Sequence, residues 1–304
     1  MAVRVGDTGR AASRGLRRLA SPAGLRGVGT ELAWVAAHAA LYPLGFRPER
    51  TDGRQLPRRI DDLSPQHRGL LAHDAAAAAT PVLLVHGMVD NRSIFTLLRR
   101  SLRRCGFGQV RTVNYSVFTS DVRAAAAELG RTVEQVSAET GYERVHVVAH
   151  SLGGVVARYY VQRQAGDARV HTLVTLGAPH GGTVAAQVVA RVLPLRLCRQ
   201  LRPDSDVISE LAEPAPGCRT RFLAVWSDLD QLIYPKTSAR IEHPDLVADN
   251  VLVPGLGHMS LPAAAQVSRT VSRALAHLDP DGTHLDPDGT PADIEGIRPD
   301  IDCA

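Results

Sequence analysis

The sequence predicts one α/β domain, with a mostly parallel central sheet and helices on both faces. From residue 81 onward, short runs rich in Val, Leu and Ala alternate with longer helical segments. This alternation is typical of βαβ units. The short runs are apolar throughout, which indicates strands buried on both faces. A chain of 304 residues is long enough for one such domain with an extension at each end.

The expected elements follow one another in a regular order. We expect strands at 82–85, 110–115, 145–149, 172–176, 222–226 and 250–253, and helices at 95–105, 121–140, from 152 onward and at 262–277. A segment longer than a turn separates two of these strands and contains the apolar stretches 184–195 and 208–211. In an open α/β sheet, insertions at the carboxyl ends of the strands form the walls of the binding site, so we expect a lid or cap at 183–219.

Ser151 lies on a tight turn between the strand 145–149 and the helix that starts at Leu152. A serine hydroxyl needs a base to become a nucleophile, and it must stand clear of the sheet to reach a carbonyl carbon. A strand-turn-helix elbow meets both needs when small residues flank the serine. Here these residues are Ala149, where a glycine is usual, and Gly153. We predict that Ser151 is a nucleophile; a buried serine at an ordinary turn is the alternative.

The strand 82–85 runs directly into His86, Gly87 and Met88. After such a strand the main chain must offer an N–H group to a developing oxyanion, and a glycine permits the close approach. We therefore predict the N–H groups of Met88 and Leu152 as oxyanion donors. His86 is expected to orient this loop rather than to contact a substrate.

A base and an acid complete the expected site. In this kind of elbow the nucleophile is followed along the chain by the acid and then by the base. His258 follows the last strand through a glycine-rich turn and precedes the closing helix, so we predict it as the base; His243 is the alternative. Asp228 and Asp230 both follow the strand 222–226. We predict that Asp230 fixes the histidine tautomer and that Asp228 caps a helix or faces water.

Five segments together resemble the bacterial triacylglycerol lipases. They are Val-His-Gly-Met at 85–88, Ala-His-Ser-Leu-Gly-Gly at 149–154, Val-Thr-Leu-Gly-Ala-Pro-His-Gly-Gly at 174–182, Ser-Asp-Leu-Asp at 227–230 and Gly-Leu-Gly-His at 255–258. The resemblance covers residues 81–277. It implies the α/β-hydrolase fold, a triad of Ser151, Asp230 and His258, oxyanion donors at Met88 and Leu152, and hydrolysis of acyl esters through an acyl-enzyme. An acyltransferase, a thioesterase or a non-catalytic lipid-binding protein on the same fold is the alternative.

Other polar residues near these motifs have simpler interpretations. His150 and His180 are expected to be structural residues that border the pocket. Asp204 and Asp206 are expected to cap the helix that follows them. Cys198 and Cys218 would form a disulfide in an exported protein and would otherwise be free thiols.

The expected chemistry needs no cofactor and no metal, and the four cysteines have no nearby histidine or cysteine at zinc-site spacing. The expected partner is an acyl-ester or lipid substrate. A nucleic-acid partner is not expected. The net charge of +4 is unevenly distributed, with Arg gathered near the start of the sequence and Asp near its end, and no known nucleic-acid-binding module is recognisable. The acyl-chain length and the oligomeric state stay open.

Composition also divides the chain into three regions. We expect a basic and apolar N-terminal segment with a linker at 1–80, a catalytic domain at 81–277 and an acidic, disordered tail at 278–304. The apolar run 32–44 falls short of the roughly 17–25 residues that span a bilayer. It fits a signal-peptide core, a helix on a membrane surface or a helix packed on the domain. Location inside or outside the cell is therefore open, with an uncleaved segment favoured and peripheral membrane contact an option.

Overall fold

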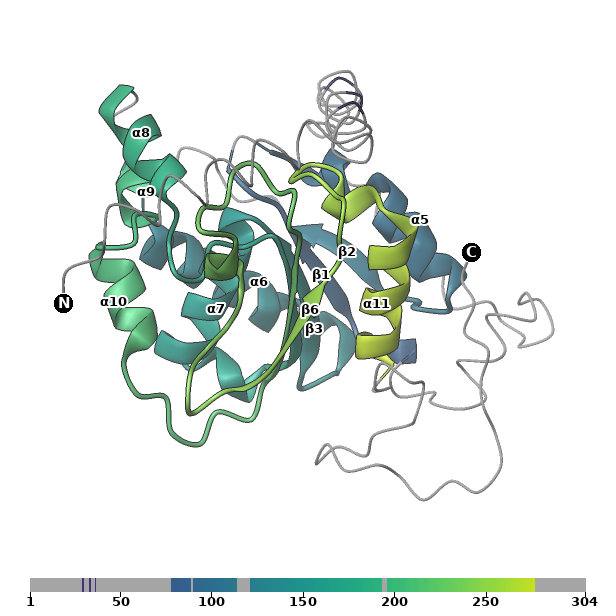
Figure 1. Cartoon of the computed structure of the whole chain (residues 1–304). Helices are drawn as coiled ribbons and strands as arrows, with labels where there is room; N and C mark the ends of the chain where they lie inside the picture. The colour runs from purple at the N-terminus through teal and green to yellow at the C-terminus, as the bar shows by residue number, and fades with distance from the viewer. Residues whose placement is uncertain are drawn as a thin grey trace.

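The structure is a computed structural model that describes residues 78–88, 90–113, 121–192 and 196–276, with the single positions 29, 33 and 36 (Figure 1). Nearly all of the N-terminal segment and the whole acidic tail lie outside these residues. The domain limits and the membrane contact expected for 1–80 therefore stay predictions. Within the described ranges, no helix has both the length and the apolar composition needed to cross a bilayer.

A six-stranded sheet in the order β2-β1-β3-β4-β5-β6 forms the centre of the domain. All neighbouring strands run parallel, as the apolar runs predicted. The strands are β1 (Val82–Val85), β2 (Val110–Val113), β3 (Val145–His150), β4 (Val170–Leu176), β5 (Arg221–Trp226) and β6 (Val247–Leu252). The strand order reverses between β1 and β3. In open α/β sheets ligands bind at the carboxyl ends of such a pair, so this is where a site is expected.

Helices cover both faces of the sheet, and the alternating side chains of β1 separate the two cores. Leu83 and Val85 belong to one core with the helices α6 (Val122–Thr140) and α7 (Leu152–Arg163). Val82 and Leu84 belong to the other core with α5 (Thr96–Arg104) and α11 (Ala265–Leu275), which lie side by side in Figure 1. Short 3-10 helices complete the connections: η3 (Arg92–Phe95), η4 (Gly166–Ala168), η5 (Lys236–Ala239) and η6 (Leu261–Ala263).

The insertion expected at 183–219 is helical. It contains α8 (Val184–Val192), α9 (Arg196–Gln200) and α10 (Asp206–Ala212), which we call the cap helices. In Figure 1 they gather on one side of the domain, with α8 farthest from the sheet and α10 beside α7. The buried side chains of α10 belong to the same core as α6 and α7. The cap is thus anchored to the domain through α10.

The N-cap residue that we expected for α10 was wrong by one position. Ser205, not either aspartate, is the N-cap, and its hydroxyl accepts a hydrogen bond from the Ile208 N–H at 3.3 Å. Asp204 instead pairs with Arg202 at 2.6 Å. Asp206 is already the first helical residue. Asp206 Oδ1 still accepts from the Val207 N–H at 2.9 Å, so this aspartate satisfies one N–H group of the first turn although the extended backbone at Ser205 makes the serine the N-cap.

Candidate active site

Ser151 occupies a sharp elbow between β3 and α7. Its backbone angles are φ 54° and ψ −126°, and its N–H donates to the Leu176 carbonyl at 3.0 Å. A positive φ is uncommon for a residue with a side chain and persists only where the surrounding structure fixes it. This turn projects the hydroxyl away from the sheet beyond the carboxyl end of β3, as expected for a nucleophile elbow.

Two glycines after the serine allow the close packing of this elbow. A Cβ atom at Gly153 would lie 2.5 Å from the carbonyl oxygen of His86 and 2.6 Å from that of Val85. A Cβ atom at Gly154 would lie 2.4 Å from the Cβ atom of Ala178 on the other side. All three distances are below any normal contact. The first turn of α7 can therefore lie between the ends of β1 and β4 only because both positions lack side chains.

Three side chains from different loops form one hydrogen-bonded series. Ser151 Oγ lies 2.9 Å from His258 Nε2, and His258 Nδ1 lies 2.7 Å from Asp230 Oδ2. Both His258 and Asp230 are buried. An ionised carboxylate only accepts hydrogen bonds, so Nδ1 carries the proton and Nε2 is free to accept from the serine hydroxyl. The structure thus brings together the three residues that the sequence singled out.

The Asp230 carboxylate is held in its charged form. Burial by itself would raise its pKa, but the attraction and hydrogen bond of His258 act against burial and give a pKa below the ordinary value. The N–H groups of Leu232 and Ile233 add to this effect, because they donate to the second oxygen at 2.9 and 3.1 Å. The Asp230 carboxylate is therefore ionised and fixed in orientation at neutral pH.

The loops that carry Asp230 and His258 are hydrogen-bonded to each other. The Ser227 hydroxyl donates to the Leu256 carbonyl at 2.6 Å, and the Gly255 N–H donates to Asp228 Oδ1 at 2.9 Å. Asp228 thus supports the turn before His258. The alternative base, His243, contacts the Glu213 carbonyl at 3.0 Å through Nε2, so it is not part of the hydrogen-bonded series.

Gly177 is a site residue that the motif analysis did not single out. It directly follows β4 with φ +56°, and a Cβ atom there would lie 2.9 Å from Asp230 Oδ2 and 3.3 Å from His258 Nδ1. Asp230 and His258 can therefore meet only beside a residue without a side chain. A glycine immediately after a buried strand was the available signal.

Met88 and Leu152 lie at the ends of the adjacent strands β1 and β3. Within the described part of the chain, the main-chain N–H groups of both residues donate to no other protein group. A Cβ atom at Gly87 would lie 2.9 Å from the Cβ atom of Ser151, so this loop passes directly beside the serine. His86 Nδ1 is 2.9 Å from the Gly87 carbonyl, which suits a side chain that orients the loop.

The cap contacts this loop through two sulfur atoms. Cys198 of α9 places its Sγ 3.7 Å from Met88 Sδ. Cys218 lies elsewhere, with its Sγ 3.5 Å from Asp167 Oδ1. Both cysteines are free thiols, so the disulfide considered from the sequence does not form. The thioether of Met88 thus links the cap to the edge of the site.

His180, like His150, was expected to be a structural residue. Its Nε2 lies 2.9 Å from the Thr175 hydroxyl on β4. Burial, together with the nearby charge of Arg158, holds the pKa of His180 well below its ordinary value. The ring is therefore neutral in the folded protein, which agrees with a structural side chain.

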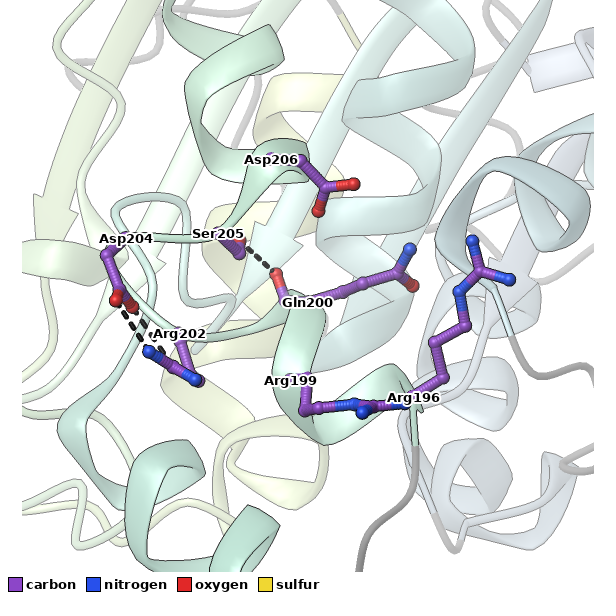
Figure 2. Close-up of a pocket in the computed structure, with 7 residues that line it drawn as sticks. All are labelled: Arg196, Arg199, Gln200, Arg202, Asp204, Ser205 and Asp206. Carbon is purple, nitrogen blue, oxygen red and sulfur yellow. Dashed lines mark hydrogen bonds and ion pairs between the residues drawn. The ribbon is translucent and has the colours of Figure 1, made fainter.

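A pocket of about 260 Å³ lies among the cap helices (Figure 2). Its lining residues are Arg196, Arg199, Gln200, Arg202, Asp204, Ser205 and Asp206. Figure 2 shows Arg202 turned toward Asp204. Ion pairs also engage Arg196, at 2.8 Å from Asp121, and Asp206, at 2.8 Å from Arg123. Most of its charge is thus compensated within the protein, and no residue of the hydrogen-bonded series lines it.

Solved structures with the same fold include several lipases. A lipase of Bacillus licheniformis in its propeptide form matches with a TM-score of 0.55 and 15 % identity, over 66 % of this chain and 50 % of that one. Lipase B of Aspergillus fumigatus matches with a TM-score of 0.55 and 16 % identity, over 72 % of this chain and 56 % of that one. Identities this low establish the fold alone.

Sequence relatives point to the same class of protein. Triacylglycerol lipases of Pseudarthrobacter phenanthrenivorans and Burkholderia plantarii are each 32 % identical over 126 residues, 39 % of this chain. These alignments span 39 % and 34 % of the two relatives, so the chain matches well under half the length of either. The palmitoyl protein thioesterase family matches residues 81–216. The chain therefore has the α/β-hydrolase fold of lipases and esterases, and part of it is similar to triacylglycerol lipases.

Proposed function

We propose that this chain is a serine carboxylic-ester hydrolase that cleaves acyl esters, with lipids as its substrate class. The observation that carries the proposal is the hydrogen-bonded series Ser151 Oγ, His258 and Asp230, with distances of 2.9 and 2.7 Å. The position of this series at the reversal point of the sheet supports it, as do the two free N–H groups beside the serine.

Acylation begins when His258 Nε2 accepts the hydroxyl proton of Ser151 as Oγ attacks the ester carbonyl carbon. The carbonyl oxygen becomes an oxyanion, and the N–H groups of Met88 and Leu152 donate to it. Each such donor lowers the barrier by about 3 kcal/mol. The carbon–oxygen bond to the alcohol then breaks, and the His258 imidazolium gives its proton to the leaving alcohol.

Deacylation repeats these steps with water. His258 accepts a proton from a water molecule, the hydroxide attacks the acyl carbon, and the proton returns to Ser151 Oγ as the fatty acid leaves. Asp230 stays ionised throughout. It fixes the ring orientation of His258 and stabilises the imidazolium in both halves of the reaction.

Ser151→Ala tests the nucleophile. The variant keeps the fold but removes the attacking oxygen, so hydrolysis of p-nitrophenyl butyrate should fall at least about 10⁴-fold. Labelling with a fluorophosphonate probe should be lost as well. Wild-type activity in the purified variant would overturn the proposal, and a wild-type protein that neither labels nor hydrolyses would favour the non-catalytic lipid-binding alternative.

A pair of amide substitutions tests the acid. Asp230→Asn removes the charge that orients His258 and should lower kcat about 10³- to 10⁴-fold. Asp228→Asn is the matched control, because Asp228 accepts a hydrogen bond from the Gly255 N–H in the turn before His258, and its kcat should stay within about threefold of wild type. If Asp228→Asn alone were inactive, the assignment of the acid would be wrong.

A thioesterase is the second candidate, favoured by the match of residues 81–216 to the palmitoyl protein thioesterase family. The same acyl-enzyme forms from a thioester, since only the leaving group differs. Comparing kcat/KM for palmitoyl-CoA and p-nitrophenyl palmitate separates the two activities. Product analysis with an added alcohol tests whether the acyl-enzyme transfers its acyl group to an acceptor other than water.

A further inference from the structure

We propose that Asp90 and His150 form a buried positioning pair, in which His150 holds the main chain of the base His258 while Asp90 orients His150. The inference rests on the proposed function, because it concerns the geometry of the same site. It assigns a role to two residues outside the triad, one on the loop after β1 and one at the end of β3.

The contact to the base has a fixed direction. His150 Nε2 lies 3.2 Å from the carbonyl oxygen of His258, and its side chain is completely buried. A carbonyl oxygen only accepts hydrogen bonds, so Nε2 must carry a proton and donate it. The side chain next to the nucleophile in sequence thus fixes the main chain of the base, 108 residues away.

Asp90 determines which way the His150 ring faces. Its Oδ2 lies 3.3 Å from His150 Nδ1, and its side chain is 6 % exposed. Whether the shared proton lies on Nδ1 or on the carboxyl group, this contact leaves Nε2 directed at the His258 carbonyl. Asp90 Oδ2 would also lie 3.0 Å from a Cβ atom at Gly87. The pair therefore lies beside residues 86–88, which we call the oxyanion loop, and beside the turn that carries His258, which we call the base loop.

The two histidine rings also pack against each other. Their centroids are 4.7 Å apart, with the planes inclined by 44°. The His258 side chain is therefore hydrogen-bonded to Ser151 and Asp230, its ring packs against that of His150, and its carbonyl group is held by His150 Nε2. Without that anchor the base loop can shift, and a displacement of about 1 Å at a catalytic group can cost about 100-fold in rate.

The test compares side chains that keep or lose the donor at the Nε2 position. The amide of a glutamine side chain reaches the place of Nε2, so His150→Gln should keep kcat within about fivefold of wild type. His150→Asn reaches only the place of Nδ1 and should lower kcat about 10- to 100-fold, with KM nearly unchanged. Activity is expressed per labelled site after fluorophosphonate titration, so that unfolded protein does not count.

A matched control separates positioning from stability. His146 is buried near the start of the same strand, and its ring packs edge-on against His171 with the centroids 5.4 Å apart. His146→Asn should lower the melting temperature as His150→Asn does but leave kcat per site unchanged. Equal kcat in His150→Asn and wild type, or equal losses in His150→Asn and His150→Gln, would overturn the proposal.

Asp90 supplies a second test should His150→Asn fail to fold. The amide of Asp90→Asn can donate to Nδ1 and preserve the orientation of His150, so its kcat should stay within about fivefold of wild type. Asp90→Ala removes the contact and should lose as much activity as His150→Asn. Equal activity of the two Asp90 variants would contradict the inference, whereas loss of the proposed function itself would appear as a wild-type protein that is not labelled at Ser151.

Discussion

Position 153 has space for a hydrogen atom and for nothing larger. The nearest atoms to a methyl group placed there are two main-chain carbonyl oxygens at the end of β1, which move only if the oxyanion loop moves with them. Gly153→Ala should therefore destabilise the protein by about 2–3 kcal/mol and lower the rate of fluorophosphonate labelling, since Met88 belongs to the displaced loop. Urea denaturation and labelling kinetics measure the two effects.

Gly181 is the matched control for this substitution. Its φ is not positive, and the nearest atom to an added Cβ atom is the Ser238 hydroxyl at 3.4 Å, an ordinary contact. Gly181→Ala should change stability by less than about 0.5 kcal/mol and leave labelling intact. If both variants behaved alike, close packing against the carbonyl groups would not explain the glycine at 153.

Individual residues were predictable from sequence to different degrees. Ser151 and His258 follow from their order and from the strands and turns around them. The choice of Asp230 over Asp228 depends on which carboxylate reaches the histidine, and on the two main-chain donors that hold it. The contact between His150 and the His258 carbonyl joins distant parts of the chain, so no local sequence pattern predicts it.

At the scale of elements, one carboxylate links three helices. Glu210 on α10 accepts hydrogen bonds from Arg123 on α6 and, at 2.5 Å, from the Tyr159 hydroxyl on α7. Glu210→Ala should cost about 1–2 kcal/mol, below the full value of a charged network because the side chain is partly exposed. It should also make the cap more susceptible to limited proteolysis.

The control for this prediction is Glu213, which follows α10. Its carboxylate is mostly exposed and lies 3.8 Å from Arg163, a pair that contributes little at the surface. Glu213→Ala should change the urea midpoint only slightly and leave the proteolysis pattern as in wild type. Equal effects of the two substitutions would mean that Glu210 does not anchor the cap.

The expected elements were most accurate where strands are buried on both faces. β1 and β3 are continuous apolar runs, and the predicted limits agree with the structure to within one residue. β6 was expected at 250–253 but spans Val247–Leu252. This edge strand has mixed exposure, with Val247 59 % exposed, so its first residues carry no continuous apolar signal. The cap helices were expected only as apolar stretches, because their packing depends on distant residues.

For the whole molecule, the balance of protons between folded and unfolded states predicts how stability depends on pH. The unfolded chain protonates His180 as the pH falls through about 6.5, whereas the folded protein keeps it neutral because it is buried. Below this pH the unfolded state binds more protons than the folded state. The free energy of unfolding therefore falls as the pH falls below 6.5, by at most about 1.4 kcal/mol per pH unit for this one group. Urea midpoints between pH 7.5 and 5 measure the decline.

A second decline is expected at lower pH. Asp167, Glu210 and Asp230 all have pKa values below their ordinary range, so their stabilisation is complete above about pH 4.5 and is lost as the pH falls through the folded values. His180→Gln should flatten the first decline and leave the second unchanged. An unchanged slope between pH 6.5 and 5 in that variant would show that His180 does not account for it.

In the proposed function, the positive φ of Ser151 means that catalysis and stability compete at one residue. A conformation of this kind costs about 1–3 kcal/mol for a residue with a Cβ atom, and glycine adopts it without that cost. Replacement by alanine removes the hydroxyl but keeps the strain, whereas replacement by glycine removes both. We therefore expect Ser151→Gly to be inactive and more stable than the wild type. The difference in the free energy of unfolding measures the cost of the backbone conformation at Ser151.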